Sequence, residues 1–349
     1  MKYSYLLIIA CLVYLFTACT PDFDLNAPYK DVPVVYGILN YQDPVHYVKI
    51  YKGFQTNNNG GVFVDAQNPD SIYYYDNIIV VLQEYENNQR TNRPDIPLTI
   101  TNELHKEDGI FYHGEKSIWY CTKEILDKNK EYKIYITNKL NGNIVEGITP
   151  LVGDFNIYSL SSVYDMINAS NIAFTKATNA VDYEIHVNFL YYEVDINTNE
   201  VVKEGKIVKN ICPHVGGDFK FNKDRDYYYK EYSATFFDDI AFQIEPNPNV
   251  VRYIGRPDAN GRCIEIEGWA AGTDMIKFIL SNQTGSSFVQ VNDKYTNICA
   301  KDGLAFGFLS SRVKCPNREF TTTPSSEDSV CFGSKTYHLG FRPYIEYKP

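Results

Sequence analysis

The chain has 349 residues and a formal net charge of −10, with 30 Tyr and 20 Phe against 3 Met. An acidic chain without a cluster of Lys and Arg is a poor candidate for nucleic-acid binding. Its length favours two domains, and its many aromatic residues fit the half-buried faces of β-sheets. We therefore expect an all-β protein with minor α content that does not bind nucleic acid.

The first feature in chain order is an apolar run at residues 6–16 (LLIIACLVYLF), preceded by a single charge, Lys2. Eleven residues are too few to cross a hydrocarbon core of ~30 Å, which needs about 20 residues of helix. They fit the apolar region of a secretory signal peptide, and the small residues Thr17 and Ala18 prepare a cleavage site. We predict a lipoprotein signal peptide over residues 1–18.

Cys19 follows the triplet Phe-Thr-Ala directly, which resembles the lipobox of bacterial lipoproteins. Cleavage before Cys19 removes one positive charge, Lys2, and changes the net charge from −10 to −11. Triacylation gives stable anchoring because each buried CH₂ contributes ~0.8 kcal/mol. Residues 19–31 then form a lipidated tether, whose last twelve residues span at most about 40 Å. The alternative is an ordinary signal peptide followed by an incidental cysteine.

Residues 32–152 carry short strand patterns and predict an N-terminal β-sandwich domain of immunoglobulin-like or transthyretin-like type. In the segment HYVKIYKGF, Val48 and Ile50 point to one face while Lys49 points to the other. Asn141-Gly142 predicts a hairpin turn. Strands are expected at residues 32–40, 46–54, 77–85, 97–102, 109–113, 117–123, 131–139 and 143–152.

Pro150 and residues 153–156 mark the joint, and residues 153–349 predict a C-terminal β-rich domain, fibronectin III-like with one inserted helix. Its clearest pattern is at residues 171–195, where Tyr183, Ile185, Val187, Phe189 and Tyr191 alternate with Glu184, His186 and Asn188. Apolar residues at i, i+4 and i+8 predict the helix at residues 233–244. Further strands are expected at residues 201–210, 262–268, 274–282 and 303–314.

Five segments together resemble a family of uncharacterised two-domain Bacteroidota outer-membrane lipoproteins, known only as a domain of unknown function. The segments are VVYGILN (34–40), HYVKIYK (46–52), TPLV (149–152), YEIHVNFLYYE (183–193) and YTNICAKDGLAFGFLSSR (295–312). The resemblance covers most of the mature chain. It implies an outer-membrane location and genes beside TonB-dependent transporters, and it carries no catalytic residues.

No HExxH, GxSxG, Walker or GxGxxG motif occurs in the sequence. Glu265 and Glu267 have the residue type of a glycosidase carboxylate pair, but at i and i+2 of a strand we interpret them as sharing an exposed face. His186 is interpreted as a solvated side chain on such a face. We therefore expect no catalysis and no cofactor, with an envelope hydrolase kept as a second alternative.

Two aromatic runs are candidate ligand-contact sites, because Tyr offers a flat apolar ring and a hydroxyl to a glycan or peptide. Capping of the sheets or lining of the domain joint is the alternative interpretation. The residues are Tyr73, Tyr74 and Tyr75 in the first run and Tyr227, Tyr228 and Tyr229 in the second. Asn222, Asp224 and Asp226 alternate as in a calcium loop, but Tyr227 stands where an EF-hand has Gly. We therefore interpret the segment as a solvated turn before a helix and expect no metal site.

Six cysteines remain after residue 19, and in an exported chain an even number favours disulfides. Cys315 and Cys331 bracket a polar segment, and closing such a loop contributes ~3 kcal/mol. We predict this one disulfide.

These observations favour a non-catalytic lipoprotein anchored in the outer membrane, on its periplasmic or cell-surface side. It is expected to serve as an accessory or ligand-binding component of an uptake complex, with an outer-membrane protein as partner. The alternative is a structural, adhesion, gliding or secretion-system lipoprotein that binds another protein.

Overall fold

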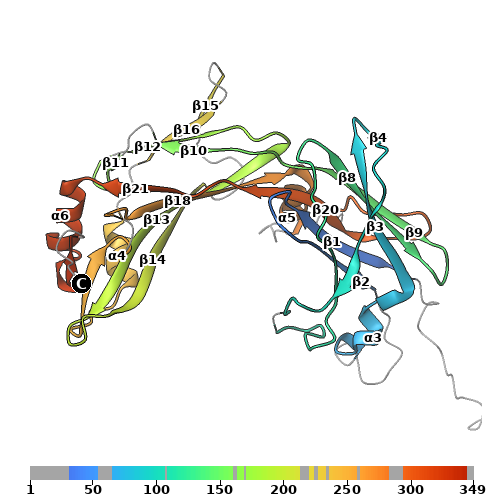
Figure 1. Cartoon of the computed structure of the whole chain (residues 1–349), viewed down its shortest axis with the longest axis horizontal. Helices are drawn as coiled ribbons and strands as arrows, with labels where there is room; N and C mark the ends of the chain where they lie inside the picture. Colours follow the sequence, from blue (N-terminus) through green and yellow to red (C-terminus); the bar gives the residue numbers. More distant parts are fainter. Residues whose placement is uncertain are drawn as a thin grey trace, which may run out of the picture.

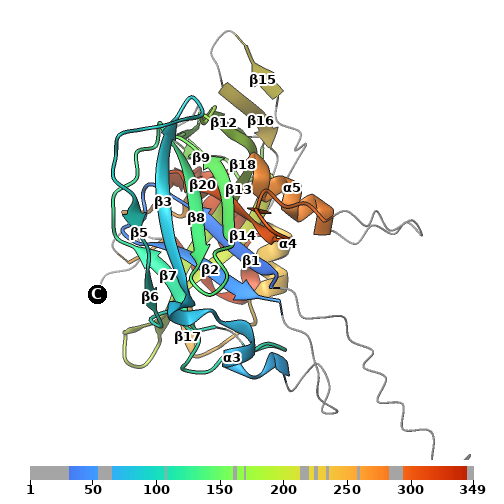
Figure 2. The same cartoon turned by 90° about the vertical axis from the view of Figure 1, so that its right-hand side faces the viewer.

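The computed structural model describes residues 31–53, 65–106, 108–159, 163–168, 170–212, 220–223, 227–232, 236–257, 260–282 and 294–343. Strands dominate these ranges and pack as sandwich-like layers (Figures 1 and 2), so the expected all-β fold with minor α content is confirmed. One inserted helix was expected in the C-terminal part, but its described ranges contain three α-helices, and a fourth lies in the N-terminal part. The helices are α3 (Pro69–Ile72), α4 (Phe237–Gln243), α5 (Thr273–Asn282) and α6 (Pro324–Phe332), with 3-10 helices η1 (Tyr75–Asn77) and η2 (Tyr337–Leu339).

The largest sheet runs through both halves of the chain in the order β22-β17-β13-β18-β20-β1-β2-β7-β6. Beside this path, β14 pairs with β13, and β21 pairs with β11 and β18. Its strands are β1 (Pro33–Leu39), β2 (His46–Lys52), β6 (Thr99–Thr101), β7 (Trp119–Thr122), β11 (Val163–Tyr164), β13 (Ala180–Asp195), β14 (Val201–Cys212), β17 (Val250–Ile254), β18 (Ile264–Gly272), β20 (Phe306–Lys314), β21 (Arg318–Thr322) and β22 (Phe341–Arg342).

Two smaller sheets supply the facing layers, in the orders β19-β9-β8-β3-β4 and β10-β12-β16-β15, and β5 pairs with β3. The first contains β3 (Ile78–Glu86), β4 (Gln89–Arg90), β5 (Ile96–Pro97), β8 (Glu131–Asn138), β9 (Ile144–Pro150) and β19 (Cys299–Ala300). The second contains β10 (Ile157–Ser159), β12 (Ser170–Thr175), β15 (Lys220–Asn222) and β16 (Tyr227–Tyr232).

The first hydrophobic core lies between the layer of β1, β2 and β7 and the layer of β3, β8 and β9, which overlap face to face in Figure 2. Strand β2 alternates buried and half-buried residues from His46 to Tyr51, with Val48 and Ile50 on the buried face, as the sequence pattern predicted. The expected hairpin between β8 and β9 forms, with Gly142 at φ +70° in its turn. The predicted strands at 32–40, 46–54, 77–85, 131–139 and 143–152 are therefore confirmed.

The second core lies between β13 and β18 on one side and β10, β12, α4 and α6 on the other (Figure 1). The apolar members of the alternating segment, from Tyr183 to Tyr191, all belong to this core, as predicted. Helix α4 confirms the predicted helix over residues 237–243.

The two cores share strand β20. Residues 306–311 pair in parallel with β1, and residues 312–314 pair with β18 of the second half. Leu309, with Ile298 and Ala305 just before it, belongs to the first core although it lies late in the chain. Leu151 lies in the first core and Val152 in the second, next to the predicted joint. We call the parts of the molecule around the first and second cores the first and second lobes. The first lobe therefore contains residues of the N-terminal half together with residues 298–309 from late in the chain. Figure 1 shows strand β20 spanning the two lobes.

Two predicted strands are not formed. Residues 274–282 lie in helix α5 instead, because a short apolar run is compatible with either a strand or a helix. Residues 109–113 form bends and irregular chain.

Candidate functional site

The first tyrosine run does not offer its rings to a ligand as predicted. Tyr73 is 1% exposed and Tyr74 is 5% exposed, and both belong to the first core. The prediction assumed a strand, in which neighbouring side chains alternate; the run instead joins α3 to η1, and Tyr75 has φ +47°. This geometry turns two consecutive rings inward. Tyr75 remains half-buried, against Tyr73.

The second run lies on β16. Tyr228 is half-buried and stacks on Phe174 at 5.1 Å between ring centroids. It therefore packs against the second core rather than standing free in solvent. The side chains of Tyr227 and Tyr229 lie outside the described residues. Of the calcium candidates, Asn222 ends β15 and pairs with Tyr227 in a hairpin, whereas Asp224 and Asp226 also lie outside the described part.

The predicted disulfide between Cys315 and Cys331 is not formed, and no disulfide joins any two cysteines of the described ranges. The intervening segment is not the open polar loop that the prediction assumed. It contains strand β21, which pairs with β18, followed by helix α6. Cys315 is buried at the end of β20, while Cys331 is buried on α6. Cys19 lies outside the described residues.

The most unusual chemistry lies on the face of β13 and β18 opposite the second core. Glu265 and Glu267 alternate with the core residues of β18 and lie on this face. The sequence suggested an exposed face, but Glu265 is only 3% exposed and Glu267 8%. Asn188 of β13, which pairs with Glu265 in the strand register, is completely buried.

Cationic side chains enclose the two carboxylates. Lys206 of β14 binds both of them through Nζ, at 3.0 Å from Glu265 Oε2. Lys314 Nζ lies 2.8 Å from Glu267 Oε1, and a guanidinium nitrogen of Arg256 lies 3.1 Å from Glu265 Oε1. The amide nitrogen of Asn188 donates to Glu267 Oε2 at 2.8 Å.

These contacts fix the ionisation of both acids. Burial alone would raise the pKa of Glu267, but hydrogen bonds from Lys206, Lys314 and Asn188 outweigh it and hold the pKa at about 2. Burial is likewise outweighed at Glu265, whose pKa is lowered by Lys206 and Asn317. A general acid for glycoside hydrolysis needs a raised pKa. The pair therefore has the properties of a structural ion network.

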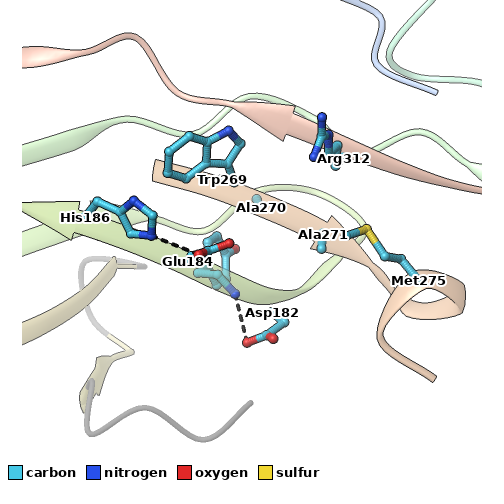
Figure 3. Close-up of a pocket in the computed structure, with 9 residues that line it drawn as sticks. Asp182, Glu184, His186, Trp269, Ala270, Ala271, Met275 and Arg312 are labelled. Carbon is cyan, nitrogen blue, oxygen red and sulfur yellow. Dashed lines mark hydrogen bonds and ion pairs between the residues drawn. The ribbon is translucent and has the colours of Figure 1, made fainter. Parts of the chain in front are cut away.

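An open cavity of about 150 Å³ lies beside this network, where β13, β18 and β20 meet α5. Figure 3 shows its side chains coming from these four elements. The lining residues are Asp182, Tyr183, Glu184, His186, Trp269, Ala270, Ala271, Met275 and Arg312.

The strand register explains the position of the cavity. Ala271 of β18 pairs with Asp182 on β13 and with Arg312 on β20, so a small residue stands between two longer ones. Trp269, two residues earlier on the same face, pairs with Glu184. Met275 follows at the start of α5, where its backbone N–H donates to Ser310 Oγ at 3.0 Å. The cavity is thus the space above Ala271 between Trp269 and α5.

His186 is not the solvated side chain that the sequence suggested. Its side chain is 21% exposed, and Nε2 lies 2.8 Å from Glu184 Oε1. The imidazole also contacts the Trp269 ring edge to face, at 4.9 Å between centroids. Lys314 Nζ lies 5.2 Å from the centroid of the same indole. Trp269 therefore connects the cavity to the ion network.

Sequence reasoning singled out His186, Glu265 and Glu267 but interpreted them as exposed. It missed Trp269, Met275 and Arg312. The sequence signal for this site was the alternation of residues 184–188 and 265–269. This alternation predicts that each strand presents a polar face. It does not predict that the two strands are neighbours in the sheet.

No protein-family model matches the chain, and no curated protein matches it. Within the described ranges, no helix is long and apolar enough to cross a membrane. The fold and the site define the class: an all-β protein with minor α content, a buried ion network and a small amphipathic cavity.

Proposed function

We propose that the protein is a non-catalytic lipoprotein, anchored by Cys19 to the outer membrane, that serves as a ligand-binding or accessory component of an envelope uptake complex. The observation that carries the proposal is the sequence Phe-Thr-Ala-Cys immediately after the apolar run at residues 6–16. A cysteine in this position has a definite chemical fate, which is lipid attachment after cleavage.

The start of the folded part supports a short tether. The carboxylate of Asp31 accepts hydrogen bonds from Tyr74 and from the amide of Asn138, at 2.8 Å for Asn138. Twelve residues separate Cys19 from this point, with Asp31 included, and span at most about 40 Å. Under this proposal, the tether joins the first lobe near the turn between β8 and β9.

A binding role is supported over hydrolysis by the electrostatics of the acidic pair. Glu265 and Glu267 are ionised and saturated with donors, so neither holds a proton for a leaving group at neutral pH. The cavity beside them combines an indole with polar side chains, which is the usual composition of a small-molecule site.

The anchor is tested by Cys19→Ala, with Cys11→Ala in the apolar run as the matched control. Wild type and Cys11→Ala are expected to incorporate labelled palmitate and to fractionate with membranes, whereas Cys19→Ala is expected to do neither. Membrane retention of Cys19→Ala, together with an unlabelled wild type, would show that the lipoprotein proposal is wrong. Recovery of a TonB-dependent transporter with the tagged wild type supports the uptake role.

A structural or adhesion role is the second candidate, favoured by strand β14. Among the described strands β14 pairs only with β13, and it exposes Val202 at 55% and Val208 at 46%. An exposed strand edge is a template for pairing with another chain. Recovery of secretion or motility proteins instead of a transporter, lost on Val208→Asp, would favour this role.

A further inference from the structure

The cavity carries opposite charges on its two sides. Glu184 belongs to β13 and Arg312 to β20, the two strands that flank β18. Neighbouring strands lie about 4.7–4.9 Å apart, so the two backbones are separated by about 10 Å across β18. Ala271, which pairs with Arg312 on one side and with Asp182 on the other, provides a low floor. Glu184 lies one same-face position along β13 from Asp182, opposite Trp269. Figure 3 shows Glu184 and Arg312 on opposite sides of β18. Both side chains are long enough to reach over Ala271 toward a common ligand.

Both charged groups retain hydrogen-bonding capacity. His186 and Asn210 both bind Oε1 of Glu184, and Oε2 accepts no hydrogen bond from the residues that the structure describes. Arg312 is exposed and forms no ion pair with any described carboxylate, in contrast to Arg256, which binds Glu265 and Glu319. A guanidinium has five donors in a fork that matches a carboxylate. The cavity therefore offers a donor fork on one side and an acceptor on the other.

The remaining walls are apolar. Trp269 of β18 precedes Ala271 in the chain and Met275 of α5 follows it, and both line the cavity. Indole and thioether groups favour contact with an aliphatic or aromatic side chain. The volume of about 150 Å³ is well below the ~300–1,000 Å³ of pockets for drug-sized ligands. The occupant is therefore one amino-acid-sized unit.

We infer that this cavity binds an α-carboxylate that carries a neighbouring N–H donor and an apolar side chain, as in a free amino acid or in the carboxy-terminal residue of a peptide. Arg312 binds the carboxylate, Glu184 accepts from the nitrogen, and the side chain lies between Trp269 and Met275. His186 positions Glu184 through Oε1. The inference rests on the binding role proposed above and names its ligand class.

Isothermal titration of the full chain, purified in detergent, tests the inference with four probes: L-leucine, Gly-Gly-Leu, the C-terminal amide of Gly-Gly-Leu, and D-glucuronate. Leucine or Gly-Gly-Leu is expected to bind, and the amide is expected to bind about tenfold to a hundredfold more weakly than the free tripeptide, since it lacks the charge-assisted contact to Arg312. Binding of glucuronate with equal or greater strength, or binding of none of the four, would overturn the ligand class.

Variants identify the cavity as the binding site. Arg312→Gln is expected to weaken binding about tenfold to a hundredfold, and Arg312→Lys less, since it keeps the charge but not the fork. Arg342→Gln on β22, an exposed arginine on a different strand, is the control and leaves binding unchanged. Equal effects of the two glutamine variants would contradict the assignment, and circular dichroism of each variant separates lost binding from lost folding.

Glu184→Gln distinguishes the two sources of the ligand. It removes an ion pair with the ammonium of a free amino acid but keeps an acceptor for the amide N–H of a peptide. A large loss for leucine indicates a free amino acid, and a small loss for Gly-Gly-Leu indicates a peptide end; no loss for either probe would refute the contact with Glu184. Because these titrations do not depend on the lipid, the inference and the Cys19 proposal can fail independently.

Discussion

The ion network around Glu267 makes a strong prediction about stability. Substituting Glu267→Gln keeps the shape of the side chain and removes the charge that binds Lys206 and Lys314. The carboxyl pKa falls from 4.5 to about 2 in the folded protein. This difference corresponds to ~3 kcal/mol of folding free energy when the group is ionised in both states.

The measured loss of unfolding free energy in Glu267→Gln should be about 2–3 kcal/mol, because the remaining groups of the ion network can relax. Lys206 keeps its contact with Glu265, and Lys314, whose side chain is 41% exposed, can turn to water. Since the folded-state pKa is lowered, the stabilisation is complete above the unfolded pKa and is lost as the pH falls toward 2. The gap between wild type and Glu267→Gln is therefore greatest at neutral pH and narrows in acid.

Urea unfolding at about pH 7 and about pH 2.5 measures this gap. The chain has two tryptophans, so a Trp119→Phe background leaves Trp269, which adjoins the network, as the fluorescent reporter. Glu204→Gln on the exposed edge strand β14 is the matched control and should change stability by less than about 0.5 kcal/mol. A loss that is the same at both pH values, or no larger than that of the control, would refute the electrostatic account.

Two further predictions concern the first lobe. Gly307 has φ +100°, and a Cβ there would overlap the carbonyl oxygen of Val35. Gly307→Ala should therefore lower the unfolding free energy by at least about 1–3 kcal/mol in the same urea assay; Gly109→Ala, with open space around it, should not, and equal effects would contradict the argument. Burial, and then Lys106, lower the pKa of Lys49 to about 8. Lys106→Gln should raise it toward 10.5, by NMR titration of ¹³C-methylated lysines, and an unchanged value would mean that burial acts alone.

The strands of the fold were predictable where one face is buried. Val48 and Ile50 of β2, and Tyr183 to Tyr191 of β13, alternate with polar residues and occupy the cores as expected. Helix α6 had an unused signal, since Thr323 caps it and Pro324 follows at the first position. Helix α5 had a weaker one, because its apolar run is short and also fits a strand.

The site was less predictable, for a physical reason. The alternation in β18 shows that Glu265 and Glu267 share the face opposite the two core isoleucines. The same sequence pattern would occur whether water or lysine side chains cover that face. The cover comes from Lys206 and Lys314, distant in the chain, whose contacts depend on the pairing of β14 and β20 with their neighbours. Local sequence patterns carry no information about such pairing.

Strand β20 connects these findings, because one segment serves both lobes and the cavity. Leu309 packs in the first core, Val313 packs in the second, and Arg312 between them lines the cavity. Arg312 pairs with Ala271 of β18, and Ala271 pairs with Asp182 of β13, so the strand register fixes the three cavity strands relative to one another. Through its parallel pairing with β1, the same strand β20 joins the cavity to the lobe that begins at Asp31.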